Sequence, residues 1–270
     1  MVVVPGSIIN YHHDDFSAAQ LAERKGPQRI SVVIPARDEE RTVGRVVSAV
    51  RDGLVDRIGL VDDVVVVDDG SQDRTADMAA HAGARVVPSA AARDAHGRPV
   101  GLGKGEAMRT GLAATEGDIV VFLDADVSNL RAHFVTGLLG PLLTNASTVL
   151  VKGRFGRPAR GDVAGGGRVT ELVARPALAL LFPDLSEVEQ PIAGETALRR
   201  EALAHLELDG GYGVDLGMLI DVAGRYGADA LAQVDLGVRV HRSRPLDQLV
   251  PQAHAVLGAA LRRAGVLSQS

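Results

Sequence analysis

Ser31-Val32-Val33-Ile34-Pro35 is a short apolar run that ends at a proline, and this pattern predicts a buried strand. The next apolar residues have the i, i+3, i+4, i+7 spacing of an amphipathic helix; they are Val43, Val46, Val47 and Val50. A second apolar run, Val64–Val67, ends in Asp68-Asp69-Gly70-Ser71. Strand, helix and strand in this order predict the beginning of a doubly wound, nucleotide-binding layout.

The same alternation continues along the first half of the chain. A helix is predicted from Asp73 or Thr75, a strand at 85–87, a helix at 103–116 and a strand at 119–123. Each strand-like run is apolar throughout, which is typical of a parallel sheet covered by helices on both faces. We therefore expect an α/β fold with a Rossmann-like, mostly parallel sheet, right-handed crossovers, and a ligand site beyond the carboxyl ends of the strands.

The second half of the chain has a less regular pattern. It predicts helices near 129–140, from Arg168, near 215–226 and at 246–264, strands near 148–154, 192–199 and 230–241, and a loop at 156–167. No repeat and no long linker interrupts it. We expect one continuous domain with an unpatterned N-terminal lead-in (1–29), a first half (30–127) and a second half (128–270) that ends in a C-terminal helix.

Composition excludes several classes of protein. The chain has 270 residues, of which 29 are basic and 34 acidic, and it has no Cys and no Trp. The absence of Cys excludes a disulfide scaffold, thiolate zinc and a Cys nucleophile, and the net charge of −5 argues against nucleic acid as a partner. The chain contains three lysines (Lys25, Lys104 and Lys152), so a lysine inside a motif is informative.

The N-terminal sequence contains no pattern that predicts export. Met1–Asn10 lacks a basic leader, and the longest uncharged run, Val135–Val151, is too short and too polar for a membrane span. We expect a cytoplasmic protein. His12, His13, Asp14 and Asp15 have metal-ligating side chains, but adjacent positions near a terminus favour a solvated tail.

Phe122-Leu123-Asp124-Ala125-Asp126 carries the most informative side chains, at the carboxyl end of a predicted buried strand. Two carboxylates two residues apart at this point can face a hard cation and a ribose–diphosphate together, and Mg²⁺ or Mn²⁺ prefers oxygen ligands. The alternative is a pair of turn carboxylates that cap the following helix.

Gly101-Leu102-Gly103-Lys104-Gly105 is neither a P-loop, because no Ser or Thr follows the lysine, nor a dinucleotide fingerprint. It brings Lys104 to a helix N-terminus, where an ammonium and backbone N–H groups suit a phosphate. A surface loop with a solvated lysine is the alternative.

Three further clusters have polar side chains at strand or helix ends. Asp69 can accept hydrogen bonds from a uracil or ribose edge, or belong to an ordinary turn. Gly165-Gly166-Gly167-Arg168-Val169-Thr170 offers backbone N–H groups, a guanidinium and a hydroxyl to an anion, or is a flexible loop. His241, in Val240-His241-Arg242-Ser243-Arg244, is a metal-ligand candidate only beside a second protein ligand.

Taken together, these residues resemble the retaining glycosyltransferases of the GT-A fold, and specifically the glucosyl-3-phosphoglycerate synthases. The resemblance covers the chain from about residue 30 to 250 and rests on seven stretches. They are residues 33–40 (VIPARDEE), 68–71 (DDGS), 101–105 (GLGKG), 123–126 (LDAD), 167–176 (GRVTELVARP), 211–215 (GYGVD) and 236–245 (LGVRVHRSRP). The last three are the most specific.

The resemblance implies a role for each matching position. Donor binding would involve Pro35, Ala36, Arg37, Glu39 and Asp69 at the uridine, Lys104 at the diphosphate, and Asp124, Ala125 and Asp126 at the ribose and metal. Asp126 and His241 would hold Mg²⁺, or Mn²⁺ in its place. Gly167, Arg168, Thr170 and Ser243 would bind the acceptor, and Asp215 and Lys104 would be the catalytic residues. The first half would bind the nucleotide sugar and the second half the acceptor.

The implied reaction moves glucose from UDP-glucose to the 2-hydroxyl of 3-phosphoglycerate, with retention, and gives glucosyl-3-phosphoglycerate. A homodimer without nucleic-acid or membrane partners is also implied. Three positions depart from the family pattern: Arg37-Asp38 stands where Leu-Asn is common, Asp215 where Glu is usual, and Ser243 where Asn contacts the acceptor.

Other functions remain open at this stage. They are mannosyl-3-phosphoglycerate synthesis from GDP-mannose, transfer to a polyprenyl phosphate, a sugar nucleotidyltransferase that releases pyrophosphate, and a non-catalytic nucleotide-sugar binding protein.

Overall fold

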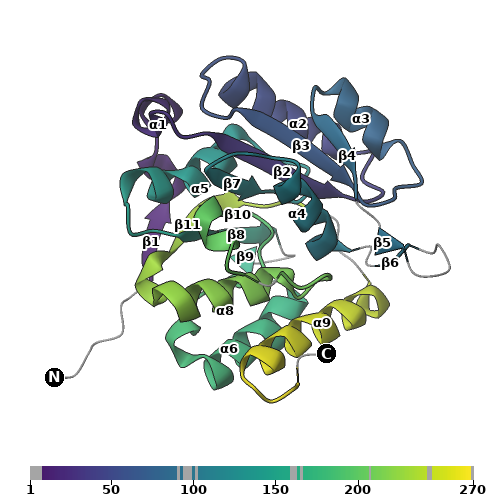
Figure 1. The fold of residues 1–270 in the computed structure, drawn as a ribbon, viewed down its shortest axis with the longest axis vertical. Helices are drawn as coiled ribbons and strands as arrows, with labels where there is room; N and C mark the ends of the chain where they lie inside the picture. Colours follow the sequence, from purple (N-terminus) through teal and green to yellow (C-terminus); the bar gives the residue numbers. More distant parts are fainter. Residues whose placement is uncertain are drawn as a thin grey trace.

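A mixed, mostly parallel sheet forms the centre of the molecule (Figure 1). The computed structural model describes residues 8–89, 92–93, 99–100, 103–158, 163–164, 167–206, 208–241 and 245–268. The strands lie in the order β1-β11-β8-β10-β7-β2-β3-β4. Their bounds are β1 Ile9–His12, β11 Leu231–Val238, β8 Leu150–Pro158, β10 Thr196–Arg199, β7 Ile119–Phe122, β2 Ile30–Ala36, β3 Asp63–Asp68 and β4 Arg85–Pro88.

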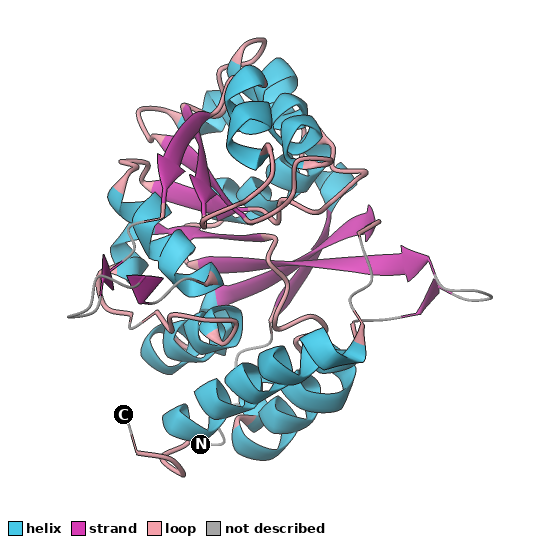
Figure 2. Cartoon of the chain, turned by 90° about the vertical axis from the view of Figure 1, so that its right-hand side faces the viewer, coloured by secondary structure: helices cyan, strands magenta, loops and turns pink. Residues whose placement is uncertain are grey.

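Helices cover both faces of this sheet, as Figures 1 and 2 show. The first face is covered by α1 Ala18–Lys25, α2 Val43–Val50, α3 Thr75–His81 and α5 Ala132–Thr144. The second is covered by α4 Lys104–Ala113, α6 Arg175–Leu181, α7 Arg200–Leu203, α8 Val214–Tyr226 and α9 Leu246–Arg263. The predicted doubly wound fold class is confirmed.

The two faces explain why the strand sequences are apolar throughout. In β2, Val32 and Ile34 belong to the core on the first face, whereas Val33 belongs to the core on the second. In β3, Val64 and Val66 alternate with Val65 and Val67 in the same way. Since each face of the sheet is buried, successive side chains of these strands face one apolar core or the other, which favours apolar residues at both alternating positions.

The second half differs in detail from the prediction. β10 is antiparallel to both of its neighbours, β7 and β8, so the sheet is mixed at its centre. β8 continues to Pro158 and pairs with β9 (Val163–Ala164), where a loop was expected from residue 156. The helix expected at 129–140 is α5, which begins three residues later. A short pair of strands, β5 (Ala92–Arg93) and β6 (Pro99–Val100), was not predicted.

The unpatterned lead-in (1–29) contains regular structure that the sequence did not predict. β1 adds a parallel edge strand beside β11, and α1 packs on α5. Between them a 3₁₀ turn, His13–Asp15, lies against α5, and the side chain of His13 is only 18% exposed. Residues 12–15 are therefore an ordered turn and not a tail, although the side chains of His12, Asp14 and Asp15 are exposed to solvent as expected. The short strand has no alternating pattern because its hydrogen bonds to β11, and not a buried face, fix it in the sheet.

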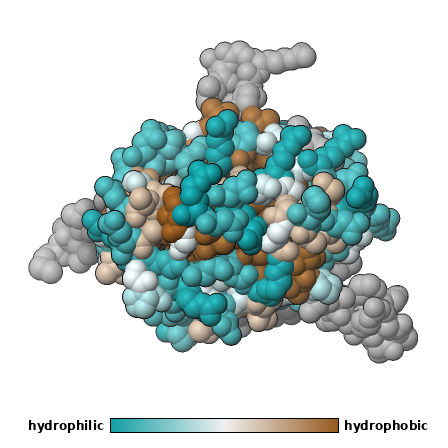
Figure 3. All heavy atoms as spheres, turned by 90° about the horizontal axis from the view of Figure 1, so that it is seen from above, coloured by the Kyte–Doolittle hydropathy of each residue, from teal (hydrophilic) through white to brown (hydrophobic). Residues whose placement is uncertain are grey.

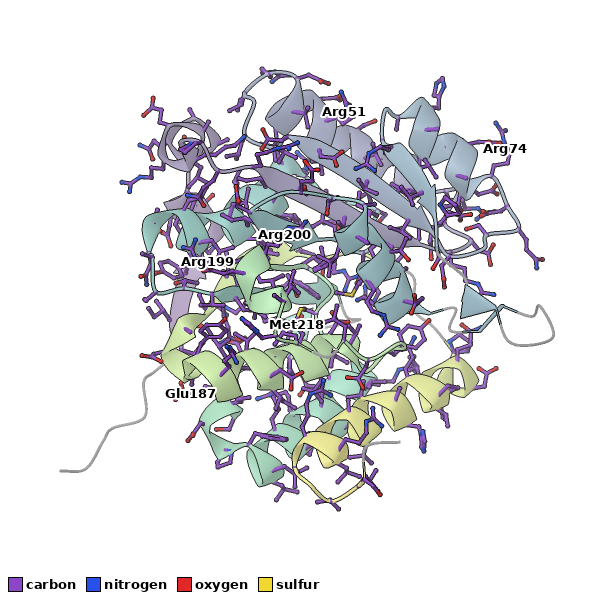
Figure 4. The ribbon with its side chains drawn as sticks, in the orientation of Figure 1. Arg51, Arg74, Glu187, Arg199, Arg200 and Met218 are labelled. Atoms are coloured by element: carbon purple, nitrogen blue, oxygen red, sulfur yellow. The ribbon has the colours of Figure 1, made fainter. Side chains whose placement is uncertain are left out.

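Two arginines at the end of β10 fix the surrounding loops (Figure 4). Arg199 donates to the carbonyl of Leu142 (2.8 Å), in the last turn of α5, and to that of Thr148 (2.9 Å), which follows α5. Arg200 donates to the Leu112 carbonyl (3.1 Å) and the Thr115 hydroxyl (2.8 Å), at the end of α4. The antiparallel strand thereby joins the two layers of helices.

The side of the molecule on which α2 and α3 lie is largely hydrophilic (Figure 3). Among the residues that the structure describes, no helix is both long enough and apolar enough to cross a bilayer.

Candidate active site

A cleft of about 380 Å³ lies where β2, β3 and β7 end, between these strands and helices α8 and α9. It is lined by every described residue that the sequence analysis assigned to a site: Pro35, Ala36, Arg37, Glu39, Asp69, Lys104, Asp124, Ala125, Asp126, Gly167, Arg168, Thr170, Asp215 and His241. Ser243 lies outside the described residues, as do Gly101, Leu102, Gly165 and Gly166. The structure thus brings together side chains that are up to about 200 positions apart in the sequence.

The loops after β2 and β3 hold one another in place on the donor side of the cleft. The Asp69 N–H donates to the carbonyl of Ala36 (2.9 Å), and the Asp69 carboxylate accepts from the Gly103 N–H (3.3 Å). Asp69 is 5% exposed, and its burial raises the pKa of the carboxyl. Arg37 lies 3.9 Å away and counteracts that shift.

Asp38 explains one departure from the family pattern. Its φ of +56° lies in the left-handed region, where Asn and Asp are the side chains best tolerated apart from Gly. Its carboxylate accepts from the Gln72 N–H (2.8 Å), and its own N–H donates to the Ser71 hydroxyl (3.0 Å). Asp can replace Asn here without changing the backbone.

Lys104 forms two ion pairs at the centre of the cleft. Its Nζ lies 2.8 Å from Asp215 Oδ2 and 3.0 Å from Asp124 Oδ1. Burial alone would lower the pKa of Lys104, but the two carboxylates outweigh it and hold that pKa above its usual value. The shorter Asp215 therefore still reaches Lys104, although the family usually has Glu at this position.

Arg239 is a functional candidate that the sequence analysis quoted but to which it gave no role. Its Nη2 lies 2.7 Å from Asp124 Oδ2 and 3.1 Å from Asp126 Oδ1, and its guanidinium lies over the Phe155 ring at 4.9 Å. On the other side, Nε lies 3.2 Å from Glu195 Oε1. Arg239 therefore orients both carboxylates of the D-x-D stretch.

Glu195 is the second residue that sequence reasoning missed. It is fully buried, and this burial raises its pKa to about 7 even though Arg239 opposes the shift. The sequence offered one signal for Glu195: it is the single acidic residue in the mostly apolar stretch Ile192–Leu198. Its partner, Arg239, is 44 positions away in the sequence, so the pattern alone did not reveal the pair.

Lys152 lies beneath the cleft, in β8, and is 1% exposed. It donates to the Ala193 carbonyl (2.7 Å) and the Thr196 hydroxyl (2.9 Å). Burial is the main cause that lowers its pKa, to about 8. The buried lysine holds the start of β10 against β8 and so supports Glu195 from below.

Asp126 and His241 have the donor set that a hard or borderline divalent cation needs. A backbone bridge joins Val127 to His241, and the Ser128 N–H donates to the Val240 carbonyl at 2.9 Å. The Asn129 side chain accepts from the Val240 N–H (2.8 Å) and donates to the Val238 carbonyl (2.7 Å). These bonds hold His241 next to the D-x-D stretch, so the residues present fit a metal.

Another side of the cleft is formed by the start of the segment that leads into α6 and by one face of α9. Gly167, Arg168 and Thr170 line it, with Thr170 buried and Arg168 exposed. Leu249, Gln252 and Val256 of α9 face them and were not predicted as site residues. Periodicity identified α9 as a helix but did not indicate which of its faces borders a ligand site.

Comparison with known proteins agrees with this arrangement. Residues 31–206 match the family described as Glycosyl transferase family 2. The glucosyl-3-phosphoglycerate synthase of Mycobacterium tuberculosis is 47% identical, with 97% of this chain and 82% of that protein covered. The enzyme of the same name from Petrotoga mobilis is 39% identical, with 94% and 80% covered.

Solved structures of the tuberculosis enzyme have the same fold. In one, a complex with Mn²⁺, UDP-glucose and phosphoglyceric acid, the match covers 97% of this chain and 89% of that chain at 46% identity, with a TM-score of 0.87. Another holds Mg²⁺ and UDP, also with a TM-score of 0.87. Similarity over nearly the whole chain, in sequence and in fold, shows that this protein belongs to Glycosyl transferase family 2 and, within it, to the family of the glucosyl-3-phosphoglycerate synthases.

Proposed function

We propose that this protein transfers glucose from UDP-glucose to the 2-hydroxyl of 3-phosphoglycerate and retains the configuration of the transferred carbon. The observation that carries the proposal is a single cleft with a donor side and an acceptor side. Lys104, Asp124, Asp126 and His241 lie on the first side, and Arg168 and Thr170 on the second. Relatives of known structure bind UDP-glucose with phosphoglyceric acid, or UDP with the glucosyl-3-phosphoglycerate product.

The donor side suits a nucleoside diphosphate. Asp69 and the loop after β2 would receive the uracil, and Lys104 would contact the diphosphate. Because two carboxylates keep Lys104 charged and fixed, it can stabilise the negative charge that develops on the departing diphosphate without moving.

Asp126 and His241 would hold Mg²⁺ or Mn²⁺ beside that diphosphate. A bound divalent cation supplies Lewis-acid stabilisation of the leaving group. Arg239 contributes by holding Asp126 and Asp124 in one orientation.

Asp215 is placed to contact the sugar or the acceptor hydroxyl. Its Oδ2 is fixed by Lys104, whereas Oδ1 is buried and has no hydrogen-bond partner among the described residues. A buried acceptor atom without a partner is costly, and a hydroxyl donor from a substrate would satisfy it. Retention requires the acceptor hydroxyl on the same face as the departing diphosphate, and a cleft shared by both substrates allows this.

We also propose a cytoplasmic homodimer. Large apolar side chains are exposed on the adjacent helical segments around α6 and α9, which lie side by side in Figure 1. They include Leu180 (81% exposed), Leu172 (75%), Leu246 (66%) and Val250 (60%). An exposed apolar surface of this kind is typical of a subunit interface.

The central experiment is a donor and acceptor panel with Mg²⁺, which measures released UDP, GDP or pyrophosphate. We expect UDP release from UDP-glucose that depends on 3-phosphoglycerate. GDP release from GDP-mannose would identify a mannosyltransferase instead, and pyrophosphate release would identify a nucleotidyltransferase.

The acceptor assignment has its own test. Arg168→Ala should raise the KM for 3-phosphoglycerate roughly 30-fold, the loss of one charge-assisted contact of ~2 kcal/mol, and leave the KM for UDP-glucose nearly unchanged. Arg168→Lys should rescue part of the loss, because an ammonium lacks the bidentate fork. Arg175→Ala, which removes a surface arginine paired with Glu171, is the matched control. Equal losses for both substrates in Arg168→Ala would show that Arg168 only maintains the loop.

A further inference from the structure

A cluster of three imidazoles and a carboxylate lies away from the cleft, where the 3₁₀ turn after β1 meets α5. His12, His13 and Asp14 come from the turn, and their ligand atoms lie within 4.8 Å of one another. His133, in the first turn of α5, adds its ring at a centroid distance of 4.3 Å from that of His13. None of these residues lines the cleft.

The spacing of the ligand atoms matches a coordination sphere. Asp14 Oδ1 lies 3.1 Å from His13 Nδ1. Ligands at ~2.0–2.2 Å from one cation are separated by about 3.0–3.4 Å along the edges of an octahedron or tetrahedron. The separation of these two atoms is therefore that of two ligands on one ion.

The turn is organised before any ion binds. The His12 N–H donates to the Asp15 carboxylate (2.8 Å), and the His12 Nδ1 accepts from the Asp14 N–H (3.3 Å), which forms a reciprocal capping box. The lone pair of His12 Nδ1 is occupied by this hydrogen bond, so Nε2 is the ring atom of His12 that would bind an ion. β1 pairs with β11 up to His12, so the sheet fixes the start of the turn.

His133 is oriented from the opposite side. Its Nε2 lies 3.2 Å from the Leu236 carbonyl, which can only accept, so Nε2 carries the proton and Nδ1 keeps its lone pair. A ring N–H bonded to a backbone carbonyl is the usual support of a metal-ligating histidine.

We propose that His12, His13, Asp14 and His133 form a second cation site, which takes a borderline divalent transition metal such as Zn²⁺ or Co²⁺. Imidazole nitrogens with a single carboxylate suit these ions, whereas Mg²⁺ prefers an all-oxygen set. The ion would join the N-terminal turn to α5, two segments about 120 positions apart in the sequence. It would stabilise the edge of the sheet at β1, and none of its ligands lines the cleft.

The test is a Co²⁺ titration followed by visible absorption. It uses the metal-stripped full chain carrying Asp126→Asn, which removes one of the two predicted ligands of the metal site in the cleft. We expect one equivalent of Co²⁺ per chain, displaced by Zn²⁺ and not by excess Mg²⁺. Asp14→Asn and His133→Gln, each added to that chain, should weaken binding roughly tenfold or more. His205→Gln, an exposed histidine outside the cluster, should bind Co²⁺ like the parent.

A second readout keeps the test independent of any one variant's fold. Saturating Zn²⁺ should raise the thermal unfolding midpoint of the parent chain and of His205→Gln, but not that of Asp14→Asn, whose carboxylate is 78% exposed and tolerates substitution. The proposal would be overturned if the parent did not bind Co²⁺. It would also be overturned if Asp14→Asn and His133→Gln bound Co²⁺ as tightly as the parent.

Discussion

Gly194 has no side chain, and the Asp124 carboxylate fills the space that a Cβ would occupy there. A Cβ at residue 194 would overlap both carboxylate oxygens and the Cγ of Asp124. The constraint is one of space alone, because the φ of Gly194 does not lie in the left-handed region. Asp124 in turn fixes Lys104 and Arg239, so one methyl group would disturb the donor side of the cleft.

We therefore predict that Gly194→Ala lowers turnover on the order of 100-fold, since a displacement of about 1 Å at reacting groups has this effect. The matched control is Gly224→Ala in α8, where a Cβ meets no atom within 4 Å. That control should keep full turnover and raise the free energy of unfolding by about 0.5–1 kcal/mol, because alanine is the better helix former. Steady-state kinetics and urea unfolding measure both. Full activity in Gly194→Ala would show that Asp124 needs no fixed position.

Lys152 makes the stability of the fold depend on pH. Its pKa in the folded protein, about 8, is lower than the 10.5 of an unperturbed lysine. Between these values the unfolded chain binds more protons than the folded one, so the free energy of unfolding rises with pH across this window. Below pH 8 lysine is charged in both states, and the full cost of burying the charge is present.

The predicted comparison is the parent chain against Lys152→Met at pH 7, 8, 9 and 10. Between pH 8 and 10 the parent should gain up to about 3 kcal/mol relative to the variant, and the difference should be constant between pH 7 and 8. Chemical denaturation gives the two curves. Parallel curves over the whole range would mean that Lys152 is charged and fully compensated in the fold.

At the scale of elements, helix α9 is attached to the rest of the molecule by a cluster of ion pairs. Arg263 binds Asp221 of α8 through Nε and Nη2, both at 2.7 Å, and Asp209 through Nη1 at 2.7 Å. Arg262 adds a single contact to Asp209 at 2.6 Å. Asp209 precedes Gly210, whose carbonyl accepts from Glu106 in the first turn of α4 (3.1 Å). The end of α9 is thereby coupled to the segment that carries Lys104.

We expect Arg263→Ala to lower the free energy of unfolding by about 2 kcal/mol, because it leaves two partly buried carboxylates without their partner. Arg262→Ala, whose guanidinium is more exposed, should cost less than ~1 kcal/mol. Since the other end of α9 lines the acceptor side of the cleft, Arg263→Ala should also raise the KM for 3-phosphoglycerate more than that for UDP-glucose. Urea unfolding measures the change in stability, and initial rates measure the change in KM. Equal changes in Arg263→Ala and Arg262→Ala would contradict the proposed coupling between the end of α9 and the cleft.

How well the sequence predicted the structure differs from one element to the next. Val32–Ile34 and Val64–Val67 are apolar at every position, and burial on both faces requires that pattern, so these strands were predicted correctly. β10 was also expected as a strand, but its antiparallel direction depends on the path of the chain and not on composition. The cleft residues at strand ends were recognisable because catalytic loops follow parallel strands. Glu195, Arg239 and Gly194 were missed because their roles arise from contacts between distant segments.

At the scale of the whole molecule, two hydrophobic cores lie on opposite faces of one sheet, and the cleft opens where the second core ends at α9. The outer surface around α6 and α9 is not covered by either core. Leu180 is 81% exposed and Leu257 is 41% exposed, while Val256 and Ala260 on the inner side of α9 are buried. The exposed apolar side chains on the outer side of α9 support the proposed homodimer, because such a surface is typical of a subunit interface.

The proposed dimer is therefore predicted to depend on Leu180. Leu180→Glu introduces a charge that would have to be desolvated in the interface, and it should weaken self-association at least tenfold, by more than about 1.4 kcal/mol. Ile9→Glu, at the opposite edge of the sheet in β1, is the matched control and should remain dimeric. Sedimentation velocity over a range of concentrations gives the mass of each species. Because α9 lines the acceptor side of the cleft, the monomeric variant should also bind 3-phosphoglycerate more weakly while UDP affinity is preserved. A parent chain that sediments as a monomer at every concentration would exclude this interface.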